Sequence, residues 1–345
     1  VYAERAIITD SALDAVVANS RAAQEKWMLS SFDERGKYCL KFLDALLSMN
    51  DDITTEIAWQ MGRPISHGPL EINRGFQERA RHMMALAAGS LADVAAPPKD
   101  GFTRFIRKEP VGTVLVVAPW NFPYLTSVNS IVPALLAGNT IVLKHATQTL
   151  LCAERYAQAM QAAGMPEGVF QIVHATHADV AEMIADERIG FVVFTGSVAG
   201  GHSIQRAAAE RFIGTGMELG GKDPAYVRAD CDLAYTIAET VDGVFFNTGQ
   251  SCCSIERIYV DAAIYDSFVD GFIELTRKYV LGNPLDPATN LGPMVSTNAA
   301  EFVGGRLLKR SGRAHGALVA RRQSPPHKWG RPNPGPGCLA AAIPR

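Results

Sequence analysis

Hydrophobic side chains in the first hundred residues recur at the spacing of amphipathic helices. The pattern predicts helices that begin near Ser11 and Asp33, a third over residues 53–61 and a longer one over residues 71–91. Serine and aspartate are common helix N-caps, because their side chains accept hydrogen bonds from the backbone N–H groups of the first turn. We therefore expect the chain to begin with a group of helices.

A different pattern begins near residue 102. Residues 102–108 alternate as an exposed strand does, and residues 111–118 form an apolar run typical of a strand buried on both faces. Helical and strand segments then alternate: helices over 125–136, 150–163, 180–184 and 202–209, and strands over 140–144, 169–174 and 190–195. This alternation predicts an α/β fold with a parallel, Rossmann-like sheet and helices on both faces.

A second α/β segment begins near Lys222. Residues 225–227 and 255–260 read as strands, and residues 232–246 and 264–280 read as helices. Beyond Gly304 the sequence offers one short helix near residues 306–309 and no further periodicity.

Composition and charge exclude several classes of protein. The 345 residues carry a net charge of -2 and are 48% hydrophobic, so nothing favours nucleic acid as a partner. No apolar run is long enough to span a membrane, so no membrane partner is expected. The six cysteines lack CxxC spacing, which favours reduced thiols and a cytoplasmic location, and we expect no metal site.

The charge is unevenly distributed. Residues 304–345 contain nine basic residues, no acidic residue, six prolines and seven glycines. Such a composition buries little apolar surface, so we expect the tail after about Leu308 to be disordered.

The candidate nucleophile lies in the stretch 246–253. Cys252 and Cys253 follow a glycine turn, where backbone N–H groups can stabilise a thiolate. Taken alone, this stretch favours two small buried cysteines over a nucleophile.

Other polar residues follow the predicted strands, where ligands of parallel sheets bind. Asn121, within Pro-Trp-Asn-Phe-Pro, is a potential oxyanion donor, and Lys144 ends the strand 140–144. Gly196 begins a glycine-containing turn suited to a pyrophosphate, although the GxGxxG pattern is absent. Glu218, before two glycines, is a potential general base. In isolation each residue favours an ordinary turn, surface or hinge role over a functional one.

Together and in this order, these stretches closely resemble the aldehyde dehydrogenase superfamily. The motifs are PWNFP at 119–123, Lys144, FTGSxxxG at 194–201, ELGGK at 218–222 and NTGQSC at 247–252. The resemblance implies that Cys252 is the nucleophile, Glu218 the general base and Asn121 the oxyanion donor. It also implies NAD or NADP as the cofactor, bound by Trp120, Lys144, Gly196, Ser197, Gly201 and Leu219.

The resemblance implies oxidation of an aldehyde, a semialdehyde among the options, through a thiohemiacetal and a thioester. Cys253 lies one position beyond the motif and is expected to have a packing role. The alternatives are an inactive remnant that binds nucleotide or a partner subunit without turnover, and an esterase-like hydrolase that uses the same cysteine.

The sequence departs from the family at three places. His145-Ala146-Thr147 follows Lys144, where the family often has Pro-Ser-Glu with an acid for the ribose, so NAD and NADP stay open. The segment 174–177 replaces a usual glycine turn and carries two histidines, which we expect to lie in a capping loop. The resemblance runs from about Ala12 to Val303, and the family continues for a further segment.

These observations predict three regions. Residues 1–220 should hold the N-terminal helices and the NAD(P)-binding domain, with 100–112 as a candidate oligomerisation strand. Residues 221–303 should form an incomplete α/β catalytic domain, and residues 304–345 an unrelated tail on a truncated chain. A family-like homo-oligomer would be weakened by that truncation.

Overall fold

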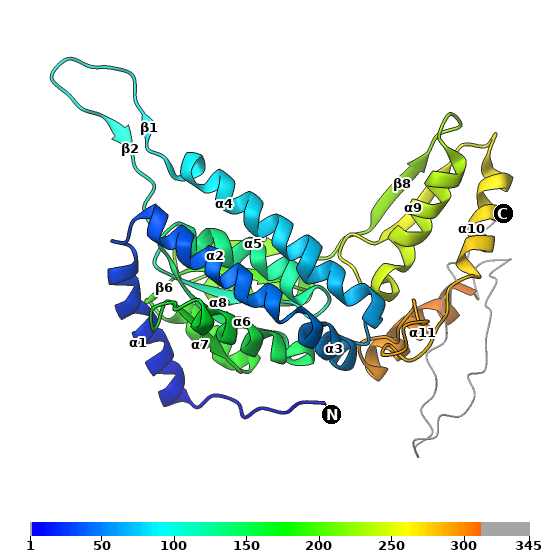
Figure 1. The fold of residues 1–345 in the computed structure, drawn as a ribbon, viewed down its shortest axis with the longest axis horizontal. Coiled ribbons are helices and arrows are strands. Elements are labelled where there is room, and N and C mark those ends of the chain that lie inside the picture. The colour runs from blue at the N-terminus through cyan, green and yellow to red at the C-terminus, as the bar shows by residue number, and fades with distance from the viewer. Residues whose placement is uncertain (1, 312–345) are drawn as a thin grey trace. The chain divides into compact units, whose positions relative to one another are not determined.

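The computed structural model describes residues 2–311. The chain divides into two compact units, seen in Figure 1. The first unit contains the residues up to Glu56 together with Gly68–Gly220. The second unit contains Ile57–His67 together with the residues from Gly221 onward. The short segment Ile57–His67 therefore lies with the second unit, although the sequence analysis left it in the first domain.

The N-terminal third is helical, as predicted. It contains α1 (Asp10–Trp27), α2 (Phe32–Ser48), α3 (Asn50–Met61), a 3-10 turn η1 (Ile65–His67), a π-helical stretch η2 (Leu70–Phe76) and α4 (Gln77–Leu91). The expected caps were wrong. Helix α1 begins at Asp10, before Ser11, and Ser31 rather than Asp33 caps α2. The Ser31 hydroxyl accepts from the Glu34 N–H, and the Glu34 carboxylate accepts from the Ser31 N–H at 2.8 Å, which is a capping box.

The first unit contains the predicted parallel sheet. Its five strands are β3 (Thr113–Val117), β4 (Thr140–Lys144), β5 (Phe170–Val173), β6 (Ile189–Thr195) and β7 (Gly214–Glu218). Their order across the sheet is β5-β4-β3-β6-β7, and every neighbouring pair is parallel. The chain winds from β3 toward one edge and then returns to β6 for the other edge. This doubly wound order confirms the predicted Rossmann-like class.

Helices cover both faces of the sheet. Helix α1, α7 (His177–Ala185) and α8 (Val198–Ala208) share one apolar core with the strands, including Leu13, Leu115 and Val192. On the other face, α5 (Pro123–Leu136) packs on β3 and β4, and α6 (Leu151–Ala162) packs on β5. The rings of Tyr124 and Tyr156 join α5 and α6, with centroids 5.2 Å apart. Strand β3 is buried along its whole length, as its apolar run predicted.

Strand β7 was not predicted from the sequence. Its residues Gly214 and Gly216 have low strand propensity, because glycine has no side chain to pack. The ring of Phe191 on the neighbouring β6 fills the space instead. A Cβ at position 214 would lie 2.4 Å from Phe191 Cε2. The two glycines are therefore part of the fit between β6 and β7.

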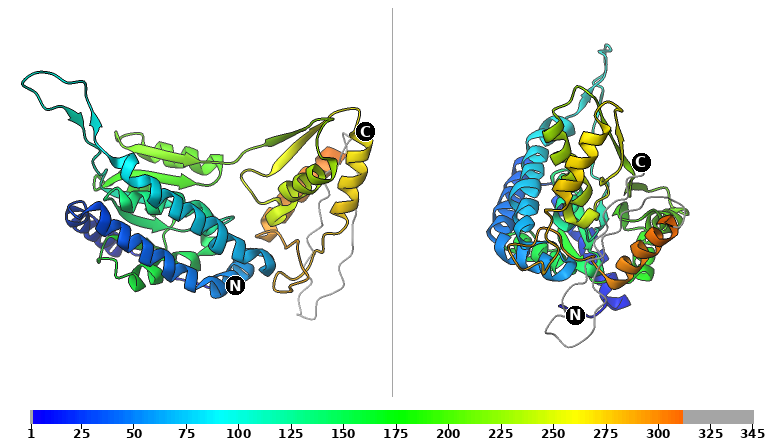
Figure 2. Two further views of the ribbon diagram at one scale, coloured as in Figure 1. Left: turned by 45° about the horizontal axis from the view of Figure 1, so that its top comes forward. Right: turned by 90° about the vertical axis from the view of Figure 1, so that its right-hand side faces the viewer.

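Strands β1 (Val94–Ala95) and β2 (Phe105–Ile106) are an antiparallel pair at the base of an arm, which Figure 2 shows extending away from α4. The strand expected over residues 102–108 is thus only two residues long. Phe102 and Ile106 on this arm are exposed.

The second unit is built on two parallel strands, β8 (Asp223–Val227) and β9 (Ile255–Val260). Helices α9 (Leu233–Phe245) and α10 (Tyr265–Thr276) bury Val241, Phe245 and Phe268 against them. Helix α11 (Thr297–Ser311) begins before the short helix expected at 306–309 and continues past Val303. Of the tail expected to be disordered after about Leu308, the residues up to Ser311 belong to α11, and the rest lies outside the described range. No helix in residues 2–311 has the length and apolarity that a membrane span requires.

Candidate active site

The carboxyl ends of the parallel strands bring the predicted residues of the first unit to one edge of the sheet. The register pairs Val117 with Lys144 on one side and with Phe194 on the other, and it pairs Thr195 with Glu218. Helices leave β3 and β6 toward opposite edges, so a topological switch point lies between these strands. Dinucleotides bind at such switch points in doubly wound sheets.

Asn121 lies in the turn between β3 and α5. Trp120 and Asn121 are half-buried, and Asn121 Oδ1 accepts a hydrogen bond from the Phe122 N–H at 3.1 Å. The buried carboxylate of Glu71 accepts from the N–H groups of Tyr124 at 2.8 Å and Leu125 at 3.1 Å. Glu71 therefore caps α5, and it anchors the turn that carries Asn121. No local signal in the sequence pointed to Glu71, because it lies 53 positions before Tyr124.

Lys144 ends β4 and is only 5% exposed. Its ammonium group makes no hydrogen bond or ion pair with residues 2–311, and burial lowers its pKa. A buried cation without a partner is costly, so a bound anion or ribose hydroxyl would stabilise it. Lys144 is thus suited to holding part of a nucleotide.

His145 follows Lys144 and has a structural role. It is buried, its Nε2 donates to the Pro123 carbonyl at 3.2 Å, and its Nδ1 accepts from the Ala146 N–H at 3.0 Å. Burial, assisted by the charge of Lys144, lowers the pKa of His145 to about 4. The imidazole is therefore neutral near pH 7.

The turn between β6 and α8 is tightly packed. Ser197 caps α8 by accepting from the Gly200 N–H at 3.1 Å, and the Gly196 N–H donates to the Glu218 carbonyl at 3.0 Å. A Cβ on Gly196 would lie 2.6 Å from the Phe194 ring, and one on Gly201 would lie 2.9 Å from Leu219. These glycines allow the first turn of α8 to lie close to the strand ends, where its N–H groups favour anions.

Glu218 ends β7, and its side chain is exposed and thus accessible to water. Leu219 follows Glu218 and lies against Gly201, so these two residues of the expected cofactor site are neighbours in the structure.

The second unit carries the candidate nucleophile. The 3-10 turn η4 (Phe246–Gly249) precedes it in the chain. In this turn Asn247 and Thr248 have left-handed backbone angles, with φ of 52° and 60°. Such angles are uncommon for residues other than glycine, and least common for a β-branched residue such as threonine. Asn247 is buried, and Gly249, with φ 69°, completes three successive left-handed residues. Strain of this kind gathers at functional sites.

Cys252 and Cys253 are both exposed after this turn. Partial burial of the thiol raises the pKa of Cys252, the neighbouring Cys253 raises it further, and hydrogen bonds from the backbone of both residues oppose the rise. The sequence analysis expected these N–H groups to lower the pKa. They act in that direction, but burial outweighs them. The alternative that Cys252 and Cys253 are two small buried residues is wrong, because both side chains are exposed.

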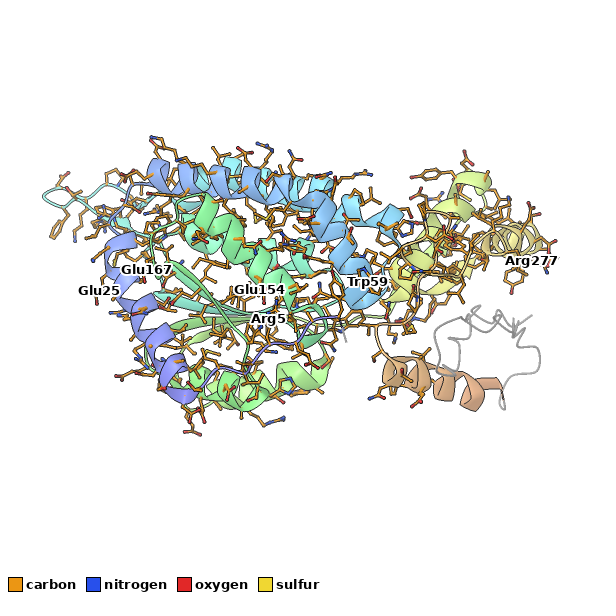
Figure 3. The ribbon with its side chains drawn as sticks, turned by 60° about the horizontal axis from the view of Figure 1, so that its bottom comes forward. Arg5, Glu25, Trp59, Glu154, Glu167 and Arg277 are labelled. Atoms are coloured by element: carbon orange, nitrogen blue, oxygen red, sulfur yellow. The ribbon has the colours of Figure 1, made fainter. Side chains whose placement is uncertain are left out.

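His174 and His177 lie in different contacts. His174 lies 3.4 Å from the Glu154 carboxylate, which also holds Arg5 at 2.6 Å, a pair labelled in Figure 3. His177 is the first residue of α7, where Thr176 and Asp179 form a capping box. Within residues 2–311 no three potential metal ligands come together.

Two features of the site were missed from the sequence. Arg63, in the segment between α3 and η1, is buried and donates from Nε to Asn247 Oδ1 at 3.2 Å. The segment Leu291–Val295 contacts the same turn, through the Gly292 carbonyl and the Val295 N–H. Arg63 lies 184 positions before Asn247, and neither segment carries a sequence signal that points to the cysteine.

Comparison with known proteins identifies the family. Residues 1–327 match the model of the aldehyde dehydrogenase family, so the chain belongs to that family. The match reaches beyond Val303, where the motifs had placed the end of the resemblance.

One curated relative is succinate-semialdehyde dehydrogenase 1 of Mycobacterium bovis (strain BCG / Pasteur 1173P2), which is named for NADP(+). It is 33% identical over 292 residues, which are 84% of this chain and 63% of that protein. The chain thus spans less than two thirds of that relative's length.

Solved structures of the same family resemble the chain closely. An NAD-dependent aldehyde dehydrogenase from Sinorhizobium meliloti is 29% identical with a TM-score of 0.88, and the match covers 92% of this chain and 64% of that one. An indole-3-acetaldehyde dehydrogenase complexed with NAD+ is 28% identical with a TM-score of 0.87, and the match covers 92% and 65%.

Proposed function

We propose that the protein oxidises an aldehyde to the carboxylic acid with NAD or NADP, with Cys252 as the nucleophile. The observation that carries this proposal is the exposed thiol of Cys252, presented after a left-handed turn in a chain of the aldehyde dehydrogenase family. A surface thiol held by an ordered turn is accessible to a substrate and oriented toward it.

The residues have distinct roles in the proposed reaction. The Cys252 thiolate attacks the aldehyde carbon and forms the C–S bond of a thiohemiacetal. The Asn121 amide donates a hydrogen bond to the oxyanion that develops on the carbonyl oxygen. Loss of hydride from the same carbon leaves a thioester on Cys252. Glu218 takes a proton from the water that attacks the thioester, and the acid and the free thiol are released.

The first unit fits a nicotinamide dinucleotide, which supplies the hydride acceptor when bound. Lys144 is a buried cation without a partner in residues 2–311, at the carboxyl end of β4 beside the switch point. Gly196, Ser197 and Gly201 bring the first turn of α8 close to the same edge, and Trp120 and Leu219 are apolar neighbours along it. We infer that Lys144 holds a ribose or phosphate and that the start of α8 lies near the pyrophosphate.

The proposed substrate is a small aldehyde. Semialdehydes are the first compounds to test, because the Mycobacterium bovis relative is named for succinate semialdehyde. The free cysteines among the described residues favour a reducing compartment, so we propose that the protein acts in the cytoplasm. A homo-oligomer, with residues 100–112 as part of its contact, also remains a proposal.

A second candidate is nucleotide or subunit binding without turnover. It is considered because the match covers 63% of the Mycobacterium bovis relative and not its full length. The two candidates differ in turnover and agree in cofactor binding.

The test compares two adjacent cysteine variants of the purified chain. Cys252→Ala should abolish cofactor-dependent aldehyde oxidation and leave only the weaker iodoacetamide labelling of Cys253 at neutral pH. Cys253→Ala should keep most of the oxidation and most of the labelling. A panel of short semialdehydes, aliphatic aldehydes and aromatic aldehydes would identify the substrate class. Equal losses in both variants would refute the assignment of Cys252, ester cleavage without cofactor would favour a hydrolase, and cofactor binding without oxidation would favour the second candidate.

A further inference from the structure

Arg63 is a buried cation that contacts the turn before the two cysteines. Its side chain is 2% exposed, and Nε donates to Asn247 Oδ1 at 3.2 Å. The guanidinium is planar and holds its N–H groups in fixed directions. The His67 ring, four residues later, stacks on Phe246 with centroids 5.3 Å apart. The segment Arg63–His67 therefore supports η4 at two consecutive positions, Phe246 and Asn247.

The turn needs such support because of its backbone. Asn247 and Thr248 hold φ angles of 52° and 60°, which L-residues adopt singly rather than in succession. The Thr248 hydroxyl donates to the Gly292 carbonyl at 3.0 Å. Arg63 thus holds Asn247, and the Gly292 carbonyl holds Thr248, so both left-handed residues are stabilised by residues outside the turn.

Gln250 connects the turn to the cysteines. Its backbone N–H donates to the Asn247 carbonyl at 3.1 Å, and the Asn247 amide donates back to the Gln250 carbonyl at 3.2 Å. The Gln250 side chain accepts from the Val295 N–H at 2.9 Å. The direction in which the chain leaves Gln250 therefore depends on Asn247, which Arg63 holds.

Two adjacent cysteines, Cys252 and Cys253, follow Gln250 in the chain after one residue, and both are exposed. Adjacent side chains in an extended segment point in different directions, so the course of the backbone after the turn decides which thiol faces a reagent. Both groups are thiols, so their surroundings must distinguish them. The Ser251 hydroxyl lies 3.4 Å from Cys253 Sγ, and the backbone sets the direction of each side chain.

We propose that Arg63 is the positioning residue that selects Cys252 over Cys253 as the reactive thiol. The inference rests on the proposed function, in which Cys252 is the nucleophile. Arg63 acts through Asn247 and touches neither thiol in the proposal. A lysine does not replace it, because the hydrogen bond to Asn247 comes from Nε, and the corresponding atom of lysine is a methylene.

The test measures which thiol is alkylated. The full chain is treated with limiting iodoacetamide, and the ratio of label on Cys252 to label on Cys253 is read by peptide mass spectrometry. In the native chain the ratio should exceed roughly tenfold, and in Arg63→Met it should fall toward one, because a misdirected turn no longer favours one geometry. Arg63→Lys should resemble Arg63→Met. Arg228→Met is the matched control, since Arg228 is exposed and pairs only locally with Asp230.

Two further variants keep the test decisive if Arg63→Met fails to fold. Asn247→Asp retains the acceptor for Arg63 but loses the amide that donates to the Gln250 carbonyl, so it should keep part of the native ratio. Asn247→Gly tolerates the left-handed backbone but loses both contacts, and it should lower the ratio further. A general loss of stability would also label the buried thiols of Cys39 and Cys152, so a lowered ratio counts for the inference where these two stay unlabelled. A native ratio near one, or an unchanged ratio in Arg63→Met and Asn247→Gly, would overturn the inference. Alkylation needs neither aldehyde nor cofactor, so absence of turnover would count against the proposed function alone.

Discussion

Burial decides the protonation state of His145. The neutral ring is fixed by the Pro123 carbonyl at Nε2 and by the Ala146 N–H and the Thr149 hydroxyl at Nδ1. Protonation would place a charge in the core beside Lys144 and would remove the acceptor at Nδ1. The pKa of about 4 reflects this cost.

The shifted pKa predicts a pH-dependent stability. Below its unfolded pKa of about 6.5, His145 binds a proton in the unfolded chain before it does in the folded chain, so stability falls as the pH drops from about 6.5 to about 4. The contribution is about 3 kcal/mol across that window. Urea unfolding at several pH values should show a smaller decline for His145→Gln than for the native chain. His177→Gln, at an exposed position of α7, should decline as the native chain does.

Glu218 is exposed at the end of β7, where water has access to its carboxylate. If Glu218 activates water for release of the acid, Glu218→Gln should still form the thioester. A rapid-mixing experiment should then show a burst of reduced cofactor, followed by steady turnover lowered by roughly 10²–10⁴-fold.

The matched control for this variant is Glu182→Gln, because Glu182 is exposed on α7 and outside the candidate site. Its burst and its steady turnover should both be native. Loss of the burst in Glu218→Gln would assign Glu218 to thioester formation or to folding, and the proposed role in deacylation would be wrong.

At the scale of elements, the start of α8 is set by one aromatic ring. The Phe194 ring lies 2.6 Å from a Cβ built on Gly196 and 2.5 Å from one built on Gly200. Both glycines are thus needed for the helix to begin directly after β6. A third glycine, Gly201, packs against Leu219 next to the end of β7, where a Cβ would lie 2.9 Å from the Leu219 side chain.

We expect Gly196→Val to displace the first turn of α8 and to weaken NAD(P) binding. Calorimetry should show a dissociation constant at least about tenfold higher, which corresponds to about 1.4 kcal/mol. Iodoacetamide labelling of Cys252, in the other unit, should be unchanged. Gly89→Ala on α4 is the control, because a Cβ there meets nothing within 4 Å. Unchanged affinity in Gly196→Val would contradict the cofactor site proposed here.

At the scale of the whole molecule, each unit has a core of its own. The core of the first unit joins α1, α7 and α8 to the sheet, and that of the second joins α9 and α10 to β8 and β9. The second unit also depends on a close contact between distant segments. A Cβ on Gly292 would lie 1.9 Å from the Gly62 carbonyl oxygen. This contact fixes Arg63 and the Gly292 carbonyl, which both hold the cysteine turn.

Gly292→Ala should therefore separate these segments and destabilise the second unit. The expected loss is roughly 1–3 kcal/mol, the usual cost of overpacking. Hydrogen exchange should show lower protection in residues 57–67 and 221–306, with the sheet of the first unit unaffected. Gly304→Ala, where a Cβ meets nothing within 4 Å, should leave exchange unchanged. Equal loss of protection in both units would show that their cores do not unfold separately.

The sequence by itself determined the elements whose signals are local. Strands β4 and β9 have the predicted bounds, because short apolar runs between turn residues are read within one segment. The alternation of strands and helices fixed the parallel sheet, and the right-handed crossing of such units left little freedom in topology. The motifs at Asn121, Lys144, Gly196, Glu218 and Cys252 identified the family in the same way, as stretches of a few residues.

The tertiary structure decided whatever depends on distant partners. Strand β7 forms because Phe191 of β6 covers its glycines, and no property of residues 214–218 alone favours a strand. Glu71 becomes the cap of α5 and Arg63 the support of Asn247 only when segments 53 and 184 positions apart come together. Burial selects such contacts, since a buried charge must find a hydrogen-bond partner wherever the fold brings one within reach.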